Sequence, residues 1–343
     1  DGCENESGGG CHVVKARNIM THPTLKPQDG QLIQGQSLAV RLANFVKLPH
    51  TVFAMPFALV GVVFASVSNS ITLATIGWTV LAFTSARFAA MGFNRVVDRD
   101  VDAINPRTAM REIPSGALTV NQAKASVLIA ALLFFFASSQ LNRLCLLLSP
   151  IALAWVLGYS YTKRFTRWSH LWLGLGLSIA PVGGYLAVAG HWSTPWWLLC
   201  ALAMAVVTWS GGFDIIYALQ DAEFDRKNGL RSIPSSIGVV NAIRLARALH
   251  VTAITCLALV AVGVPQLGNG IRPTIVWVGV GLATLLLLWE HRLVHANDLS
   301  RINAAFFTMN GIISLSFFAC VLVARLTAIT DFAIALPAGW ITP

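Results

Sequence analysis

Charged residues are scarce in this chain, and acidic residues are the scarcest. Asp and Glu together number 15 among 343 residues, and all charged types make up 11%, against 55% for hydrophobic residues. A soluble globular domain does not need that much apolar surface, so the composition favours a membrane protein. Lys and Arg give a net charge of +9, but no basic patch with readable side chains stands out, so we expect no nucleic-acid partner.

Closely spaced cysteine pairs are also lacking. The chain has six cysteines, and four of them stand singly in apolar runs, where we expect small core residues rather than ligands. The other two, Cys3 and Cys11, flank a glycine run without the paired spacing of a zinc site. Cysteine usage therefore predicts no zinc centre.

The first 44 residues are polar and include the stretch ESGGG, so we expect a mobile N-terminal arm over 1–44. A basic n-region followed by an apolar h-region is missing from it, which argues against a secretory signal. The chain begins at Asp1 rather than at methionine, which fits truncation or processing.

Apolar runs of about 20 residues recur along the rest of the chain, and a helix of that length crosses the hydrocarbon core of a bilayer. We therefore predict an all-α integral membrane protein with nine transmembrane helices, in a domain over 45–328 followed by a tail over 329–343. The expected helices cover 49–68, 71–93, 119–140, 144–161, 171–190, 196–216, 245–265, 273–291 and 303–327.

Lys and Arg residues alternate between the two ends of these expected helices. They gather before the first helix and after the second, fourth, sixth and eighth. The other connections hold only Arg143 and Arg272, with Arg325 near the end of the last helix. Because positively charged loops stay in the cytoplasm, we expect the charged loops there and the C-terminus outside, in a bacterial cytoplasmic membrane.

The segment REIPSGALTVN (111–121) has a partner in RSIPSSIGVVN (231–241), 120 residues further on. Six residues match in register, and each copy follows an aspartate-rich stretch after the second helix of a four-helix block. This predicts a duplicated four-helix unit, with halves at about 45–161 and 171–291 and a ninth helix added. Because four is even, both acidic stretches would reach the same membrane face.

Seven of the 15 Asp and Glu residues fall in these two stretches. In NRVVDRDVD, Asn94, Asp98 and Asp102 are spaced by four, which places them on one stripe of a helix. In FDIIYALQDAEFD, three aspartates at i, i+7 and i+11 again share one stripe, with a tyrosine beside it. These residues are Asp214, Tyr217, Asp221 and Asp225.

Like charges spaced by four destabilise a helix unless positive charge lies between them. One such loop is readily explained as a solvated face neutralised by neighbouring arginines. Two related loops with repeated spacing favour a functional site instead, because carboxylates at a membrane edge are costly.

Hard oxygen ligands in facing pairs suit Mg²⁺, which binds one or two carboxylates and keeps other positions for water and substrate phosphates. Arg107, Arg111 and Lys163 fall at the same expected membrane face. They could bind phosphate oxygens, the arginines as bidentate forks and the lysine as a point charge. The pattern predicts a site for a diphosphate attached to a lipid, whose tail can lie between the helices.

Two Mg²⁺ ions would neutralise the charge that develops on a departing diphosphate, which leaves an allylic cation behind. Aromatic faces stabilise cations, although ordinary packing explains each nearby aromatic residue when it is taken alone. The aromatic candidates are Trp155, Tyr159, Tyr161, Tyr185, Phe213 and Tyr217.

At these motifs the sequence resembles the UbiA-type intramembrane aromatic prenyltransferases, and in particular their 4-hydroxybenzoate polyprenyltransferase-like branch, over about 45–327. The family's pattern N-x-x-x-D-x-x-x-D matches 94–102, and D-x-x-Y-x-x-x-D-x-x-x-D matches 214–225. A Y-x-x-x-K element matches 159–163, and the arginines after the first motif match those in NPRT and REIPSG. One departure is Arg95, where many members have aspartate.

The resemblance implies a role for each matching residue. The implied metal ligands are Asp98, Asp102, Asp221 and Asp225. The implied substrate-binding residues are Asn94, Arg107, Arg111, Tyr159, Lys163 and Tyr217. The implied catalytic residues are Asp214, Asp98 and Asp221. Of these, Asp214 would assist at the acceptor or stabilise the cation. The implied reaction transfers a polyprenyl group from polyprenyl diphosphate to a ring carbon of a hydroxylated aromatic acid, as in quinone biosynthesis.

Other interpretations stay open. Within the family, the acceptor could be a dihydroxynaphthoate, as in menaquinone biosynthesis, and a haem-modifying relative is a further alternative. Both aromatic acids need a cation for the carboxylate, for which Lys47, His50 and Arg164 are candidates. Outside the family, a transporter also combines repeats with buried acids, but its ionisable groups usually lie near the midplane. A CDP-alcohol phosphotransferase would carry D-G-x-x-A-R, which the chain lacks.

The fifth expected helix is rich in glycine. Its Gly174, Gly176, Gly183 and Gly184 are typical of close packing between membrane helices. The same small residues would also leave room for a prenyl chain, so the pattern leaves both roles open.

Overall fold

The computed structural model describes residues 33, 35, 37–47, 51, 54–294, 299, 302 and 304–335, without the side chains of 304, 305, 307 and 330–335. These residues form helices and connecting turns, with no strand among them. The α-helices are α1 (Leu38–Phe45), α2 (Met55–Ala65), α3 (Leu73–Val97), α4 (Arg99–Ile104), α5 (Val120–Leu141), α6 (Arg143–Phe165), α7 (Ser169–Ala189), α8 (Trp196–Ala218), α9 (Ala222–Lys227), α10 (Ile233–Ile237), α11 (Val239–Gly263), α12 (Pro273–Leu293) and α13 (Asn310–Ala335). The 3₁₀ turns cover Leu219–Asp221 and Val264–Leu267, and a π-helical turn covers Ala304–Met309.

Eight helices in the described part of the chain are long and apolar enough to cross a membrane. They correspond to the second to ninth helices that the sequence predicted. In place of the first, the structure describes α2, whose 11 apolar residues are too few to cross the hydrocarbon core alone. The all-α, multi-pass membrane class is thus confirmed, while the count of nine crossings stays a prediction.

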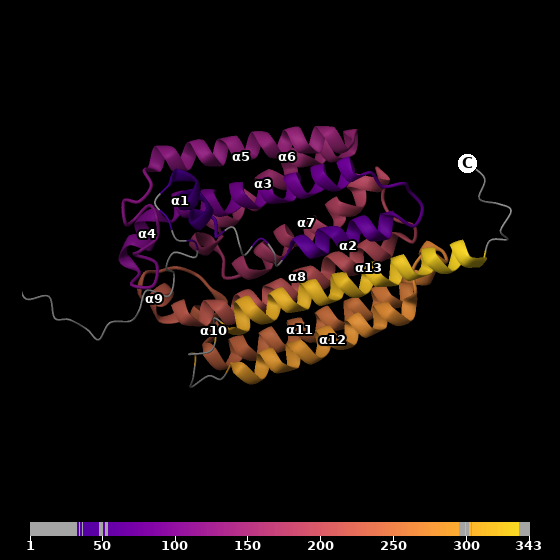
Figure 1. Cartoon of the computed structure of the whole chain (residues 1–343). Coiled ribbons are helices and arrows are strands. Elements are labelled where there is room, and N and C mark those ends of the chain that lie inside the picture. The colour runs from indigo at the N-terminus through magenta and orange to yellow at the C-terminus, as the bar shows by residue number, and fades with distance from the viewer. Residues whose placement is uncertain are drawn as a thin grey trace, which may run out of the picture.

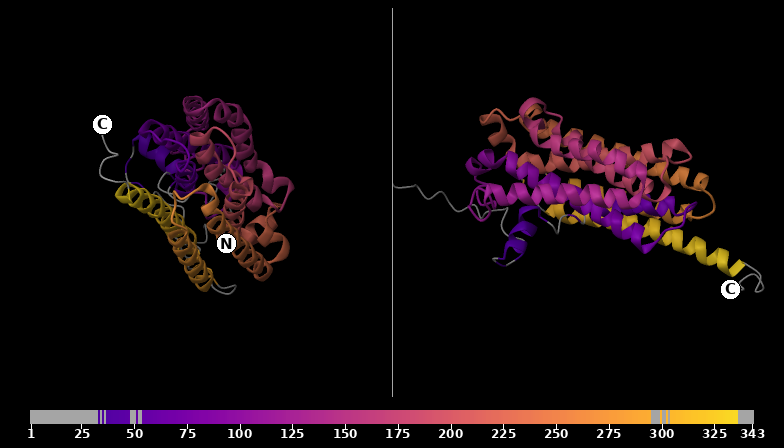
Figure 2. Two further views of the ribbon diagram at one scale, coloured as in Figure 1. Left: turned by 90° about the vertical axis from the view of Figure 1, so that its right-hand side faces the viewer. Right: turned by 90° about the horizontal axis from the view of Figure 1, so that it is seen from above.

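The long helices run alongside one another, and the short ones gather at one end of the bundle. In Figure 1, α4, α9 and α10 lie together at the left end, and Figure 2 shows the bundle from the end and from above. Because α4 directly follows α3 and α9 follows α8 through a 3₁₀ turn, both acidic stretches lie at this end, as the sequence predicted.

The packing order repeats between the two halves. Helix α3 packs along α5 in the first half, and α8 packs along α11 in the second. Helices α2 and α7, which open the two halves, pack against each other. This order is consistent with a duplicated four-helix unit, which stays a prediction, and we call the α2–α7 contact the seam between the predicted halves.

The seam requires glycine on both helices. A Cβ on Gly61 of α2 would collide with the carbonyl oxygen of Pro181, and one on Gly184 of α7 would collide with that of Ala58. A Cβ on Gly183, the preceding residue, would meet no atom within 4 Å. The sequence left open whether the glycines of α7 serve close helix packing or leave room for a prenyl chain. Gly184 permits close packing, and Gly183 leaves space.

Helices α6 and α7 are held together at two places along their length. Asn142 caps α6 by accepting from the backbone N–H of Cys145 at 2.9 Å, and its Nδ2 donates to the carbonyl of Leu186 at 2.8 Å. Nearer the acidic end, the indole N–H groups of Trp155 and Trp172 donate to each other's backbone carbonyls. Their rings stack with centroids 4.1 Å apart.

The structure refines both outer boundaries of the predicted domain. Helix α1 occupies Leu38–Phe45, so the end of the expected arm at residue 44 falls inside a helix. Arg41 of this helix donates to the carbonyl of Ala117 at 3.0 Å, which ties α1 to the loop after α4. At the other end, α13 continues to Ala335, beyond the expected boundary at 328. Most of the arm, and the tail after 335, lie outside the described residues.

Candidate active site

Asp98 marks the break between α3 and α4. It is the C-cap of α3 and the N-cap of α4. Backbone hydrogen bonds from Asp98 N to Asn94 O (2.8 Å) and from Asp102 N to Asp98 O (2.7 Å) carry the helical register across the break. The three side chains therefore stay on one side of the chain, as their spacing predicted.

The second acidic stretch makes the same transition with one additional turn. Helix α8 passes through the 3₁₀ turn Leu219–Asp221 into α9. Asp214 lies near the end of α8, Asp221 ends the turn, and Asp225 lies in α9. Asp221 and Asp225 are only 7% and 2% exposed, so both carboxylates need partners inside the protein.

Arg107 joins the two halves through a forked ion pair. Its Nε donates to Oδ1 of Asp221 at 2.9 Å, its Nη2 donates to Oδ2 at 2.6 Å, and its Nη1 donates to the hydroxyl of Tyr217 at 3.0 Å. Asn105 adds a hydrogen bond of 3.3 Å to Asp221. Because Arg107 and Asn105 belong to the first half, whereas Asp221 and Tyr217 belong to the second, the site is complete only where the halves meet.

Arg111 pairs with Asp102 within the first half. Its Nη1 lies 2.8 Å from Oδ1 and 2.9 Å from Oδ2 of the buried carboxylate. Both arginines that the sequence assigned to phosphate thus contact aspartates here. Their charge allows several carboxylates to lie close together, and their phosphate-binding role stays a prediction.

The partners of Asp98 neutralise its charge less than the arginines neutralise Asp102 and Asp221. Its Oδ2 accepts from Asn94 Nδ2 at 2.8 Å, and its Oδ1 accepts from Nη2 of Arg164 at 3.3 Å. Burial raises the pKa of Asp98 above its usual range, the neighbouring Asp102 raises it further, and Lys163 and Arg164 oppose that rise. Additional positive charge at this point would therefore stabilise the ionised carboxylate.

Asp225 offers the clearest position for such a charge. Its Oδ2 is buried without a hydrogen-bond partner, and the Nζ of Lys163 lies 3.6 Å away, beyond hydrogen-bond distance. An orphaned carboxylate oxygen among further aspartates fits a divalent cation. Among the described residues, no three His, Cys, Asp or Glu side chains converge as a ready-made metal cluster.

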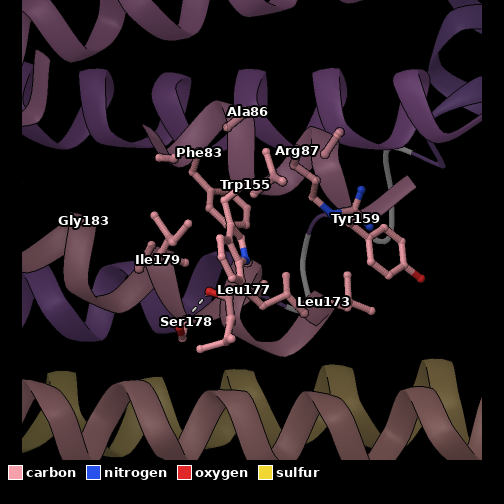
Figure 3. Close-up of a pocket in the computed structure, with 18 of the residues that line it drawn as sticks. Phe83, Ala86, Arg87, Trp155, Tyr159, Leu173, Leu177, Ser178, Ile179 and Gly183 are labelled. Carbon is pink, nitrogen blue, oxygen red and sulfur yellow. Dashed lines mark hydrogen bonds between the residues drawn. The ribbon is translucent and has the colours of Figure 1, made fainter. Parts of the chain in front are cut away.

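Two adjoining pockets meet at this end of the bundle. A polar pocket of about 150 Å³ contains all four predicted metal ligands, together with Arg107 and Lys163. A much larger apolar cavity of about 740 Å³ lies between α3, α6 and α7. Figure 3 shows Arg87 and Tyr159 toward one end of this cavity, and Ile179 and Gly183 toward the other. The residues that line both pockets are Asn94, Arg111, Tyr159, Asp214 and Tyr217.

Aromatic rings line the cavity next to this junction. Of the six aromatic candidates from the sequence, the four that line the cavity are Trp155, Tyr159, Phe213 and Tyr217. Phe306, which no sequence pattern indicated, packs on Tyr217 with ring centroids 4.2 Å apart and a tilt of 31°. It reaches this place from the π-helical turn before α13, a feature frequent at functional sites.

Two further polar residues at the site were not identified from the sequence. His170, at the start of α7, is fully buried, and its Nδ1 lies 2.7 Å from Oδ2 of Asp214. Arg87 of α3 lines the apolar cavity. A charge inside a membrane helix is a signal that could have identified Arg87, particularly since it lies seven residues before Asn94 and so near the same helix face.

The cations proposed for an acceptor carboxylate lie in different places. Lys47 is buried and lines the apolar cavity. Arg164 lies in the polar pocket, where it donates to Asp98 and to the carbonyl of Val97. His50 lies outside the described residues. Arg164 is thus placed beside the acidic stretch rather than in the cavity.

These features define a class: a multi-pass helical membrane protein with an acidic pocket that adjoins a large apolar cavity. The chain belongs to the UbiA prenyltransferase family, whose model matches residues 54–312. It is 28% identical over 232 residues to a 4-hydroxybenzoate octaprenyltransferase of Nitrosospira multiformis, covering 67% of this chain and 76% of that relative. It is 35% identical over 146 residues to one of Coxiella burnetii, covering 43% of this chain. The match spans about half the length of the Coxiella relative, 50%.

Solved structures agree with the family and the fold. A UbiA homolog from Aeropyrum pernix K1 is 32% identical, with a TM-score of 0.71, covering 80% of this chain and 98% of the other. A UbiA homolog from Archaeoglobus fulgidus, solved with GPP and Mg²⁺ bound, has a TM-score of 0.63 at 18% identity, covering 83% and 99%. At that identity the second likeness extends to the fold alone.

Proposed function

We propose that this protein is a Mg²⁺-dependent prenyltransferase, which transfers a polyprenyl group from polyprenyl diphosphate to a ring carbon of a hydroxylated aromatic acid similar to 4-hydroxybenzoate. The observation that carries the proposal is the continuity of the two pockets. A diphosphate suits the polar pocket and a prenyl tail suits the apolar cavity, so the bond between them would lie at the five shared residues. The names of the relatives support the same acceptor class.

Mg²⁺, when bound, supplies the positive charge that neutralises a departing diphosphate. Asp98, Asp102, Asp221 and Asp225 would hold it: Asp225 offers its orphaned oxygen, and the other three carboxylates would bind it beside their present partners. Two ions are proposed because two acidic stretches face one pocket. Lys163 would then be available to phosphate oxygens.

The apolar cavity suits a long tail. Thr79 and Asn94 of α3 both line it, and their separation of 15 positions along the helix corresponds to about 22 Å at 1.5 Å per residue. That length is most of the roughly 30 Å hydrocarbon core. Each CH₂ group buried there contributes about 0.8 kcal/mol, so the tail can anchor the donor while its head lies at the junction.

At the junction, the C1–O bond of the donor breaks and its electron pair leaves with the diphosphate. A ring carbon of the acceptor supplies the pair for the new C–C bond, and the ring hydrogen leaves as a proton. The rings of Tyr159 and Tyr217 would face the cationic carbon, and the carboxylate of Asp214 is suited to assist the acceptor. The apolar walls would keep water from the cation.

Arg87 is our proposed partner for the acceptor carboxylate. It lines the same cavity, and in the described part of the chain its hydrogen bond goes to the carbonyl of Val46 at 3.4 Å rather than to a carboxylate. A cation without an acidic partner in an apolar cavity suits an anionic ligand. Lys47 at the same cavity is a second contributor. The site and the charged loops are proposed to face the cytoplasm, because Lys and Arg concentrate at this end.

The test uses the purified protein with Mg²⁺ and geranyl or longer diphosphates. It is offered 4-hydroxybenzoate, the methyl ester of 4-hydroxybenzoate and a dihydroxynaphthoate, and C-prenylated products are read by mass spectrometry. We expect prenylation of the acid and weaker use of the ester. Arg87→Met should raise the acceptor KM for the acid by roughly tenfold or more, as expected for a lost charged hydrogen bond, with little effect on the ester.

Three outcomes would redirect the proposal or a part of it. Prenylation of haem or of a non-aromatic alcohol, with neither ring used, would keep the family but overturn the acceptor. Failure to release diphosphate with any acceptor would favour the transporter interpretation. Equal loss for the acid and the ester in Arg87→Met would remove Arg87 from the acceptor site.

A further inference from the structure

Asp214 is held differently from the other aspartates of the site. Its Oδ2 lies 2.7 Å from Nδ1 of His170, and the described residues give it no arginine or lysine partner. Asp102 and Asp221 are each paired with an arginine. Asp214 also lines both pockets, so its carboxylate lies where the head and the tail of a donor would meet.

The second nitrogen of His170 identifies the tautomer of the ring. Nε2 lies 3.4 Å from the backbone nitrogen of Ile233, and that N–H can only donate. Nε2 must therefore carry the lone pair, which leaves the proton on Nδ1, where it is donated to Asp214. The imidazole is thus neutral, and the His170–Asp214 pair keeps the full negative charge of the carboxylate.

The RSIPS segment explains why the ring is fixed. Arg231 donates from its backbone N–H to the carbonyl of Lys163 at 2.8 Å, and from Nη1 to the carbonyl of Phe165 at 2.8 Å. These contacts hold Ile233 against the turn between α6 and α7, and His170 lies in the first turn of α7. Since His170 is 0% exposed, its ring cannot turn without breaking both hydrogen bonds.

We propose that His170 is a positioning residue for Asp214. Its neutral Nδ1–H group holds Oδ2 and thereby aims Oδ1 at the junction of the two pockets. The pair leaves a negative charge there, which can stabilise positive charge on the donor carbon or receive the proton of the acceptor. The catalytic part of this inference rests on the proposed prenyl transfer, whereas the tautomer does not.

The kinetic test compares His170→Ala with His170→Asn. Alanine removes the donor to Asp214, so we expect kcat to fall roughly 10- to 100-fold, the usual cost of removing a partner that orients a reacting ligand, with donor KM nearly unchanged. Asparagine places Nδ2 near the position of Nδ1 and can donate to Oδ2, so His170→Asn should recover most of the loss. His170→Ala combined with Asp214→Asn should be no slower than Asp214→Asn alone, because the two residues act as one unit.

His250 provides a matched control. It is 2% exposed, donates to the carbonyl of Trp209 at 3.1 Å, and lines neither pocket. His250→Asn should lower thermal stability without changing kcat of the folded protein. If His170→Ala likewise lowers only stability, or if its effect multiplies with that of Asp214→Asn, the positioning role is wrong.

The tautomer is tested without any substrate. In protein labelled with ¹⁵N-histidine, the NMR signal that disappears in His170→Asn should be that of a neutral ring protonated at Nδ1. A ring protonated at Nε2, or at both nitrogens, would overturn the assignment. Because this result does not depend on which acceptor the protein uses, its failure is distinguishable from failure of the proposed function.

Discussion

The two acidic stretches occupy corresponding places in the two halves and differ at their first position. Asn94 lies in α3 and Asp214 lies 120 residues later in α8. Asn94 donates to Asp98 within its own stretch, whereas Asp214 is bound by His170 from α7. The first position thus supports a neighbouring carboxylate in one half, and it presents a carboxylate of its own to the cavity in the other.

The spacing after the first position also differs. From Asn94 to the next aspartate of the stripe is four residues, and from Asp214 it is seven. The longer segment from Asp214 to Asp221 ends in the 3₁₀ turn Leu219–Asp221. This turn carries Asp221 to Arg107 of the first half, so the insertion produces a contact between the halves rather than a displaced aspartate. The two halves thus share an arrangement of helices, but their acidic stretches make different contacts.

The largest effect should come from the last aspartate of each stretch. Asp102→Asn and Asp225→Asn should each remove several kcal/mol of metal-dependent stabilisation, or on the order of 10²-fold or more in kcat. Asp225→Asn should also raise the Mg²⁺ concentration needed for half-maximal rate more than Asp102→Asn, because the Oδ2 of Asp225 is the one without a hydrogen-bond partner.

Each stretch carries its own control for this measurement. Asp100 and Glu223 lie in the same short helices, but their side chains are 82% and 79% exposed. Asp100→Asn and Glu223→Gln should leave the rate within about twofold, since exposed ion pairs contribute little. A large loss in one stretch and none in the other would show that only one half provides metal ligands.

A smaller effect should separate the two arginines. Arg107 uses two nitrogens on Asp221 and a third on Tyr217, whereas Arg111 reaches both oxygens of Asp102 through one nitrogen. A lysine offers a single point of charge and so replaces the second arrangement better. Arg107→Lys should therefore raise donor KM by roughly tenfold, and Arg111→Lys by a few-fold. Equal effects would mean that both arginines act through phosphate rather than through their present partners.

Much of the fold could be predicted from the sequence, because the long helices and the acidic stripes follow from patterns among residues that are close along the chain. Apolar runs of membrane length predicted the long helices, and spacings of four, seven and eleven predicted both acidic stripes. The limit was reached where partners come from distant segments. His170 is 44 residues from Asp214, and neither residue carries a local pattern that points to the other. Likewise, the π-helical turn that brings Phe306 to Tyr217 follows from tertiary packing rather than from a sequence period.

The smallest expected effect is a change in stability when neighbouring glycines of α7 are substituted. These variants test the contact between α2 and α7. Gly184→Ala places a methyl group against the carbonyl of Ala58, and overpacking of this kind costs about 1–3 kcal/mol. Gly183→Ala points into open space, and alanine favours a helix over glycine by up to about 1 kcal/mol, so stability should stay level or rise slightly. Thermal unfolding of the two purified variants, followed by tryptophan fluorescence, measures the difference. Because Gly183 also lines the cavity, Gly183→Leu should weaken use of long donors more than that of geranyl diphosphate. If Gly183→Ala were the less stable of the pair, the α2–α7 contact would not be the seam between the halves.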